Sequence, residues 1–150
     1  MPDKVSLESI PPLPQPDALT QFFWDGTQAH KLLILRCQDC GHYIHYPRPI
    51  CNKCLSTNLA PGEVSGKGVL DTYTIPMQPI DPYFIEHMPY VYAVVELAEE
   101  KNLKIITNII DCAEEQLEIG MEVEVVFREV TPEVTLPLFR PTDPARITRS

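Results

Sequence analysis

Two cysteine pairs, Cys37-Gln-Asp-Cys40-Gly41 and Cys51-Asn-Lys-Cys54, stand in the middle of the sequence. Each Cys-x-x-Cys can fold as a tight turn that points two thiolates at one centre. The ten residues between the pairs are enough for a small hairpin over 41–50 that brings the two turns together. Four thiolates at this spacing predict a tetrahedral Zn²⁺ site, one per chain. Because protein fills all four positions, the metal is expected to be structural.

Other roles for the cysteines stay open at this point. Iron in a rubredoxin-like centre is one alternative, and disulfides or metal-free redox cysteines are another. His42 and His45 are also close enough in sequence to bind a metal, but the cysteine quartet is already complete, so surface or supporting roles are expected. Cys112 stands apart without a histidine near it in sequence, which favours a plain free thiol.

The composition limits the classes of function. The 150 residues carry 12 Lys and Arg against 21 Asp and Glu, a net charge of −9, and 44% hydrophobic residues are enough for a packed core. No apolar run approaches the roughly 20 residues that cross a bilayer, and the first residues lack a signal-peptide pattern. A cytoplasmic protein without membrane contact is expected. Most of the acid excess lies in residues 63–150, which argues against nucleic acid as the main ligand.

The first part of the chain combines prolines with aromatics. Residues 1–16 hold five of the 16 prolines, and this predicts an extended or polyproline-like arm. Asp17 is the expected N-cap of a helix over 18–29. That helix carries the aromatic run Phe22-Phe23-Trp24, which either covers the core or docks on a partner protein.

In the second half of the chain, apolar and polar residues alternate with the period of two that is typical of β-strands. The predicted strands are 66–77, 90–97, 103–110, 121–130 and 134–140. In the first of them Val69 and Tyr73 are expected on the same face, and Pro137 is expected to confine the last to an edge. One or two helical turns closed by Gly120 are predicted between the third and fourth strands. Five strands in this order are typical of an OB-fold barrel.

A proline-rich loop, 78–89, joins the first two predicted strands and carries Tyr83 and Phe84. A stiff loop with aromatic side chains loses little entropy on binding, so it is a candidate contact surface. The alternative is a loop folded over the mouth of the barrel.

The sequence therefore predicts a mainly β protein with five parts. They are a proline-rich arm (1–16), an N-terminal helix and lead-in strand (17–36), a small rubredoxin-like zinc ribbon (37–62), a five-stranded OB-fold barrel (63–141) and a tail (142–150).

The order of these motifs resembles a known family. The matching segments are Phe22–Trp24, Leu33–Gly41, Tyr46–Arg48, Cys51–Cys54, Val64–Val69, Pro89–Tyr90, Val95–Leu97, Ile119–Val123, Val126–Phe127 and Leu136–Pro141. Together they resemble the small zinc-ribbon plus OB-fold proteins long called a domain of unknown function and associated with acyl-CoA enzymes. The resemblance covers roughly residues 20–141. It departs at Glu99–Asn102, where relatives usually have a glycine-containing turn.

The resemblance implies a non-catalytic accessory subunit. Members of this family partner thiolase-superfamily proteins, such as acyl-CoA thiolases and the aldolases of steroid side-chain breakdown. The chain would then stabilise such an enzyme and help to form its acyl-CoA channel. Other members are joined to hot-dog-fold enoyl-CoA hydratases, so a hydratase accessory subunit is an alternative. No nucleophile and base stand together in the sequence, so no catalytic residue is expected here.

Two groups of residues are candidates for contacts with these partners. The basic residues near the ribbon could meet the diphosphate of CoA at the shared interface: Arg48, Lys53 and Lys67. The aromatic residues of the helix and loop could form the interface with the partner enzyme: Phe22, Phe23, Trp24, Tyr83 and Phe84. Surface solvation is the competing explanation for each basic residue.

Two further classes of function remain as alternatives. A single-stranded nucleic-acid-binding OB-fold protein needs a basic groove with stacking aromatics, and the surrounding acid excess disfavours it. An electron carrier of the rubredoxin type needs iron in place of zinc.

Overall fold

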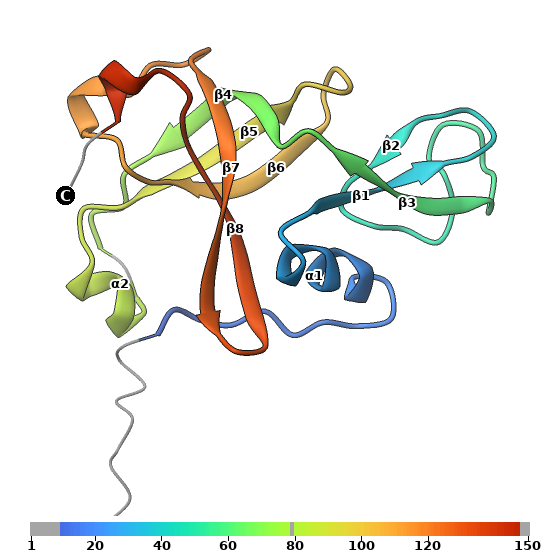
Figure 1. The fold of residues 1–150 in the computed structure, drawn as a ribbon, viewed down its shortest axis with the longest axis horizontal. Coiled ribbons are helices and arrows are strands. Elements are labelled where there is room, and N and C mark those ends of the chain that lie inside the picture. The colour runs from blue at the N-terminus through green and yellow to red at the C-terminus, as the bar shows by residue number, and fades with distance from the viewer. Residues whose placement is uncertain (1–9, 79, 148–150) are drawn as a thin grey trace, which may run out of the picture.

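The computed structural model of the chain describes residues 10–78 and 80–147. Parts of the predicted arm (1–9) and tail (148–150), together with Pro79 of the predicted loop, lie outside the described residues. Figure 1 shows a closed barrel from which a smaller three-stranded sheet projects, with helix α1 in the angle between them. The fold class predicted from the sequence is confirmed. Among the described residues, no helix combines the length and the hydropathy needed to cross a membrane.

Helix α1 (Gln21–Gln28) follows a separate turn that Asp17 caps. The Asp17 carboxylate accepts hydrogen bonds from the backbone N–H groups of Leu19 (3.0 Å) and Thr20 (2.9 Å). Thr20 itself occupies the N-cap position of α1, and its side chain makes no capping hydrogen bond. The prediction that Asp17 caps the helix is therefore wrong by one turn, because its carboxylate satisfies the N–H groups of the preceding turn.

The projecting sheet consists of β1 (Leu32–Cys37), β2 (Tyr43–Ile44) and β3 (Leu59–Val64), in the order β2-β1-β3. All its pairs are antiparallel, and β1 pairs with β3 over its full length. The segment predicted as a hairpin (41–50) contributes only β2, whose partner is β1. Strand β3 also runs two residues into the segment assigned to the barrel, so the exact domain limits stay a prediction.

The barrel closes in the order β4-β5-β6-β8-β7, which is the strand order of an OB-fold. Its strands are β4 (Lys67–Thr74), β5 (Val91–Leu97), β6 (Lys104–Ile109), β7 (Glu122–Thr131) and β8 (Val134–Pro141). Short helix α2 (Pro82–Glu86) lies in the loop between β4 and β5. The turns predicted over 113–120 form one 3₁₀ turn, Glu114–Gln116, and a second 3₁₀ turn, Pro144–Arg146, follows β8.

The expectation that Val69 and Tyr73 share one face of β4 is wrong, because the strand contains a β-bulge. The register with β5 shifts between Leu70 and Thr72, so Asp71 is the extra residue. Leu70 is fully buried before the bulge, and Tyr73 packs against the core after it. Val69 and Tyr73 therefore lie on opposite faces, because one inserted residue inverts the alternation of a strand.

Pro137 belongs to a strand that has a neighbouring strand on each side, and not to an edge strand. Strand β8 runs between β7 and β6, and Phe127 of β7 is the antiparallel partner of Pro137. The Pro137 carbonyl accepts a hydrogen bond from Oγ1 of Thr107 in β6 at 3.0 Å. Since the N–H and C=O of one strand residue point the same way, the missing N–H also faces β6. Between β6 and β8 the described residues form a single ladder pair, Ile109 with Phe139, so proline is tolerated there.

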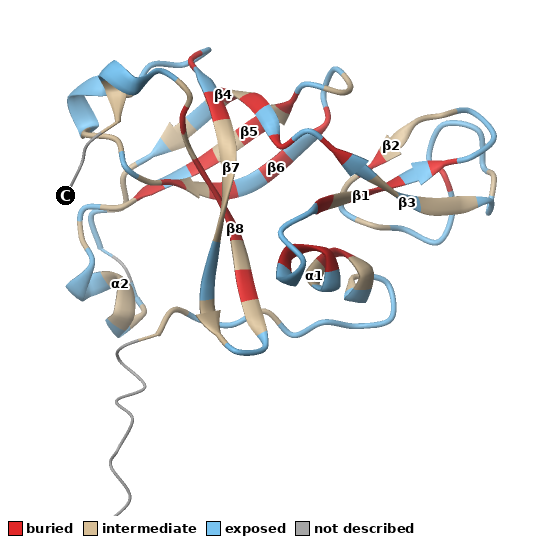
Figure 2. Cartoon of the chain, in the orientation of Figure 1, coloured by how far each residue is buried: buried red, intermediate tan, exposed pale blue. Residues whose placement is uncertain are grey.

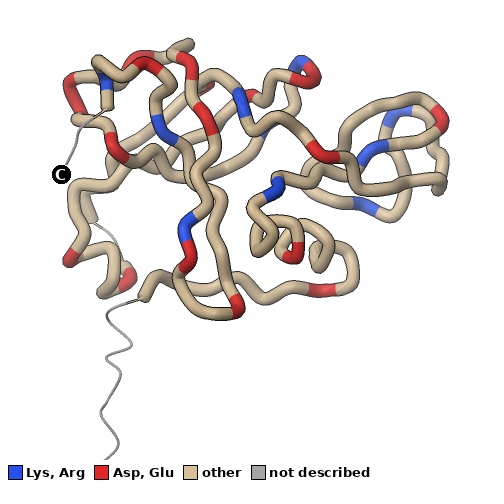
Figure 3. The backbone as a smooth tube through the Cα atoms, viewed as in Figure 1, with Lys and Arg blue, Asp and Glu red and all other residues tan. Residues whose placement is uncertain are grey.

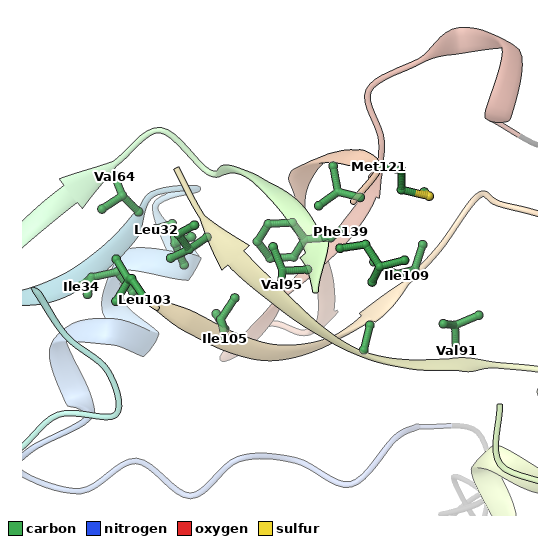
Figure 4. Packing of buried hydrophobic residues seen from close by; sticks show 14 of the residues in the cluster. Leu32, Ile34, Val64, Val91, Val95, Leu103, Ile105, Ile109, Met121 and Phe139 are labelled. Atoms are coloured by element: carbon green, nitrogen blue, oxygen red, sulfur yellow. The ribbon is translucent and has the colours of Figure 1, made fainter. Parts of the chain in front are cut away.

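One hydrophobic core fills the barrel and continues into the base of the projecting sheet. Phe139 and Val95 are fully buried inside the barrel, and Leu32, Ile34 and Val64 of the projecting sheet belong to the same cluster (Figure 4). Figure 2 shows buried positions alternating along the barrel strands, and others on β1 and on α1. A second, smaller cluster lies farther out in the projecting sheet and consists of Leu35, Cys37, Ile44 and Cys51.

We predict that Gly68→Ala destabilises the barrel strongly. A Cβ at Gly68 would lie 2.4 Å from the carbonyl oxygen of Glu96, a backbone atom held in the ladder with β5. Forced overpacking of this kind costs about 1–3 kcal/mol or more in the free energy of unfolding, which urea denaturation measures. Gly62→Ala is the matched control, because its Cβ would meet no atom closer than 3.7 Å. Equal losses in the two variants would contradict this packing argument.

Candidate metal centre and contact surfaces

The structure brings all four predicted cysteine ligands together. The Sγ atoms of Cys37, Cys40, Cys51 and Cys54 all lie within 4.8 Å of one another, and no histidine belongs to the group. Cys37 Sγ is 3.5 Å from Cys54 Sγ, and Cys40 Sγ is 3.7 Å from Cys51 Sγ. A tetrahedral ZnS₄ centre with Zn–S bonds of about 2.3 Å has sulfur–sulfur edges of roughly 3.8 Å. The thiolates are therefore at metal-ligand spacing, and the distances are far too long for disulfides.

The two cysteine turns have the same backbone construction. The N–H of Gly41 donates to the carbonyl of Cys37 at 2.9 Å, and the N–H of Leu55 donates to the carbonyl of Cys51 at 3.0 Å. The residue after each second cysteine has a positive φ, 77° at Gly41 and 64° at Leu55. Glycine adopts this conformation freely, whereas leucine is strained there, so the second turn depends more on its surroundings.

Backbone N–H groups lower the pKa of the first cysteine of each pair and so favour its thiolate form. The N–H of Cys40 is the largest of the influences that lower the pKa of Cys37 to about 6. The N–H of Cys54 lowers the pKa of Cys51 in the same way. The N–H of Ser56 favours the Cys54 thiolate, but the other sulfurs outweigh it and raise the pKa of Cys54 to about 12. Four thiolates this close repel one another, and a divalent cation relieves that repulsion.

A polar link that the sequence analysis missed joins the two cysteine turns. Asp39 of the first turn accepts a hydrogen bond from Oγ of Ser56, which follows the second turn. The same carboxylate accepts from Nδ2 of Asn58 at 3.2 Å. Both hydrogen bonds lower the pKa of Asp39, and the hydrogen bond from Ser56 has the larger effect. The pattern Asp-Cys followed by Cys-x-Ser-x-Asn was visible in the sequence, but it carried no distance information.

The three basic residues proposed to contact CoA do not share one cavity. Arg48 lines a hollow of about 240 Å³ beside the ribbon, and Lys67 lines a neighbouring hollow of about 540 Å³ on the barrel. Lys53 lies exposed between the two cysteines of the second turn. Lys101, which the sequence analysis did not select, lines both hollows. Figure 3 shows basic positions on the ribbon and acidic ones spread over the barrel.

The turn between β5 and β6, Glu99–Asn102, contacts the ribbon. Glu100 Oε2 lies 2.8 Å from Nδ1 of His42, although without the alignment of a hydrogen bond. Glu99 accepts a hydrogen bond from the backbone N–H of Ser65 at 2.7 Å, at the crossing from ribbon to barrel. Asn102 has a φ of 66°, a conformation in which asparagine substitutes for glycine better than most residues.

The helix aromatics face mainly inward. Phe23 is buried, and Phe22 and Trp24 are half-buried against the core. In the loop between β4 and β5, Tyr83 and Phe84 pack edge to face with their ring centroids 5.2 Å apart. Both line a cavity of about 500 Å³ at the end of the barrel.

Cys40→Ser is expected to abolish metal binding, because three thiolates and a hydroxyl make a much weaker site for zinc. Elemental analysis of the purified chain should give about one zinc for the wild type and close to none for this variant. Cys112→Ser is the control, since the Cys112 thiol donates to the backbone carbonyl of Ala113 and lies outside the cysteine group. A red, iron-containing wild type would contradict the assignment to zinc, and so would full zinc content in Cys40→Ser.

Both the ribbon and the barrel match domains of known proteins. Residues 24–60 match the model of the ChsH2 rubredoxin-like zinc ribbon domain, and residues 62–128 match the model of the ChsH2 C-terminal OB-fold domain. The ribbon therefore corresponds to a known metal-binding module, and its four clustered cysteines fit a structural zinc ion.

Relatives extend this match to nearly the whole chain. A DUF35 domain-containing scaffold protein of Methanocaldococcus jannaschii is 40% identical over 105 residues, which cover 69% of this chain and 72% of that protein. A probable enoyl-CoA hydratase alpha subunit of Thermomonospora curvata is 35% identical over 137 residues, or 91% of this chain. The match spans only 42% of that longer protein.

A solved structure, the Ltp2-ChsH2(DUF35) aldolase, is similar in both fold and sequence. The TM-score is 0.79 at 35% identity, covering 87% of this chain and 99% of that one. With its ribbon, its barrel and these relatives in agreement, the chain belongs to the DUF35 family, in the ChsH2-type arrangement of a rubredoxin-like zinc ribbon followed by an OB-fold.

Proposed function

We propose that this chain is a non-catalytic accessory subunit that binds and stabilises a thiolase-superfamily acyl-CoA enzyme of the aldolase or thiolase type. The supporting observation is its 35% identity to a chain of the Ltp2-ChsH2(DUF35) aldolase, 99% of which it covers. Its family relatives named as scaffold proteins support the accessory role in general. The steroid side-chain aldolase type is the first choice of partner.

The chemistry of the described side chains agrees with a partner that supplies the reaction. Four of the five cysteines form the metal group, and burial raises the pKa of the fifth, Cys112. In the described part of the chain no serine, threonine or cysteine side chain donates a hydrogen bond to a histidine. His87 contacts the backbone carbonyl of Tyr83, and His30 lies 3.4 Å from Glu129 at the surface. A nucleophile activated by a neighbouring base would need a different arrangement.

The loop between β4 and β5 is the surface that we assign to the partner enzyme. Three large apolar side chains are mostly exposed there: Met77 (81%), Ile80 (99%) and Ile85 (56%). Tyr83 and Phe84 are half-buried in the same segment. Exposed apolar groups together with aromatic side chains are typical of an interface core. The aromatics of α1 are already packed inward and contribute less to this proposal.

The same proposal includes acyl-CoA at the shared interface and a cytoplasmic location. Arg48, Lys53 and Lys67 are the proposed contacts for the CoA diphosphate, and Lys101 joins them because it lines the hollows beside both Arg48 and Lys67. A reducing compartment suits a centre of free thiolates, since it keeps them from forming disulfides.

An accessory role beside an enoyl-CoA hydratase is the second candidate. It is favoured by the 35% identity to the probable enoyl-CoA hydratase alpha subunit of Thermomonospora curvata. Under this alternative the chain would bind a hydratase and not a thiolase-like protein.

Co-expression separates the two candidates. We expect the tagged chain to elute together with a candidate thiolase-like protein, and aldol or thiolytic cleavage of an acyl-CoA to require the complex. The same tagged chain is expressed with a hot-dog-fold hydratase as the comparison. Co-elution with the hydratase alone would favour the second candidate. A thiolase-like protein that is equally soluble and active without the chain would refute the first.

Polar substitutions in the loop are expected to weaken the complex without unfolding the chain. Ile80→Ser and Ile85→Ser each remove an exposed apolar group, and we expect at least a tenfold loss in affinity for the partner, measured by titration calorimetry. Ile119→Ser is the matched control, because Ile119 is also mostly exposed (65%) but lies before β7. If all three variants bind equally well, another surface makes the contact.

A further inference from the structure

A cavity of about 370 Å³ lies where the arm, α1, the ribbon and the barrel meet. Its wall takes Pro12 from the arm, Trp24 from α1, Tyr46 from the ribbon, Ile105 from β6 and Leu138 from β8. None of the residues that line it is an Asp, Glu, Lys or Arg. The volume falls within the range of small-molecule sites, roughly 300–1,000 Å³.

His45 is the unusual member of this wall. Both of its ring nitrogens are buried, and neither has a hydrogen-bond partner among the described residues. The ring packs against Phe23, with centroids 5.6 Å apart, and against Tyr46, with centroids 4.2 Å apart. Buried polar atoms are nearly always paired, because leaving one unpaired costs about 1–3 kcal/mol. The imidazole thus has hydrogen-bonding capacity that the surrounding residues do not use.

Two other polar side chains of the wall already make hydrogen bonds to backbone carbonyls. Thr107 donates to the carbonyl of Pro137 at 3.0 Å, and Asn108 donates to the carbonyl of Val91 at 2.9 Å. Among the lining residues, His45 alone has buried side-chain nitrogens or oxygens without a described partner. Among the buried polar atoms of this wall, the imidazole is therefore the group available to recognise a polar atom of a guest.

The environment keeps this imidazole uncharged. Burial lowers the pKa of His45 to about 4, so at neutral pH the ring is neutral and offers one donor and one acceptor. A carboxylate or phosphate guest would meet no positive charge on the wall, and a cationic guest would meet no negative one. Burying an unpaired charge is far more costly than burying a neutral oxygen that is hydrogen-bonded.

We propose that this cavity binds a small, uncharged and mainly apolar molecule that carries one hydroxyl or carbonyl oxygen, held by a hydrogen bond to His45. The apolar body fills the space between Trp24 and Leu138, and the oxygen faces the imidazole. This site belongs to the chain alone and goes beyond the proposed accessory function, because binding needs no partner enzyme. Loss of partner binding and loss of ligand binding are thus separately measurable.

Trp24 makes the test direct, because it is the single tryptophan of the chain and it lines the cavity. Using the full zinc-loaded chain at pH 7.5, 1-octanol and octanoate are titrated while Trp24 emission is recorded. We expect a saturable change with 1-octanol and binding of octanoate that is at least tenfold weaker. No saturable change with 1-octanol, or equal binding of octanoate, would overturn the proposal.

Substitutions at His45 test the hydrogen bond itself. His45→Phe keeps an aromatic ring without nitrogens, and should weaken 1-octanol binding about three- to tenfold, the usual value of one neutral hydrogen bond. His45→Gln restores an uncharged donor and acceptor and should recover most of that loss. Toluene, which has no oxygen, should bind His45→Phe at least as well as the wild type. Zinc content and thermal melting show whether each variant is folded.

The outcomes remain decisive if one variant fails. Unchanged 1-octanol affinity in a folded His45→Phe would overturn the role of the imidazole. Should His45→Phe not fold, the comparison of 1-octanol with octanoate on the wild type still tests the uncharged character of the site.

Discussion

A single hydrophobic core spans the barrel and the base of the ribbon, and the rest of the molecule depends on this sharing. Leu32, Ile34 and Val64 belong to the ribbon sheet, yet they pack in the same cluster as Phe139 of the barrel. The ribbon alone has only four buried residues in its outer cluster, and two of them are the cysteines Cys37 and Cys51. So small a cluster is little support for independent folding, so we expect the segment to rely on a metal held by its cysteines at one end and on the barrel core at the other.

This arrangement agrees with the proposed accessory role. The four clustered cysteines, which fit a structural metal, stand at the far end of the ribbon, and helix α1 inserts Phe23 into the shared core at the near end. Among the described residues, the loop around α2 and the cavity beside His45 lie at the periphery of that core. A rigid frame that presents peripheral contact surfaces loses little conformational entropy when a partner binds.

Local patterns in the sequence predicted most of the frame, whereas long-range contacts could not be predicted. The cysteine ligands followed from spacing alone, because each pair is built within five residues, and the five barrel strands followed from alternation. The bulge at Asp71 was missed because the prediction carried strict alternation from Val69 to Tyr73, whereas the register with β5 shifts between Leu70 and Thr72. Pro137 suggested an edge because the sequence does not tell which strand a missing N–H faces. The cavity beside His45 draws on five separate segments, and no sequence pattern brings those together.

The turn at Glu99–Asn102 links the ribbon side of the molecule to the barrel through polar groups. A glycine-containing turn would supply the positive φ that Asn102 provides here, but it would not supply the two carboxylates before it. Those carboxylates reach Ser65 and His42, which lie at the crossing to the barrel and beside the first cysteine turn. The turn therefore adds polar contacts between ribbon and barrel to the apolar ones of the shared core. The angle between the two parts, and with it the shape of the cavity beside His45, is accordingly set by the core and this turn together.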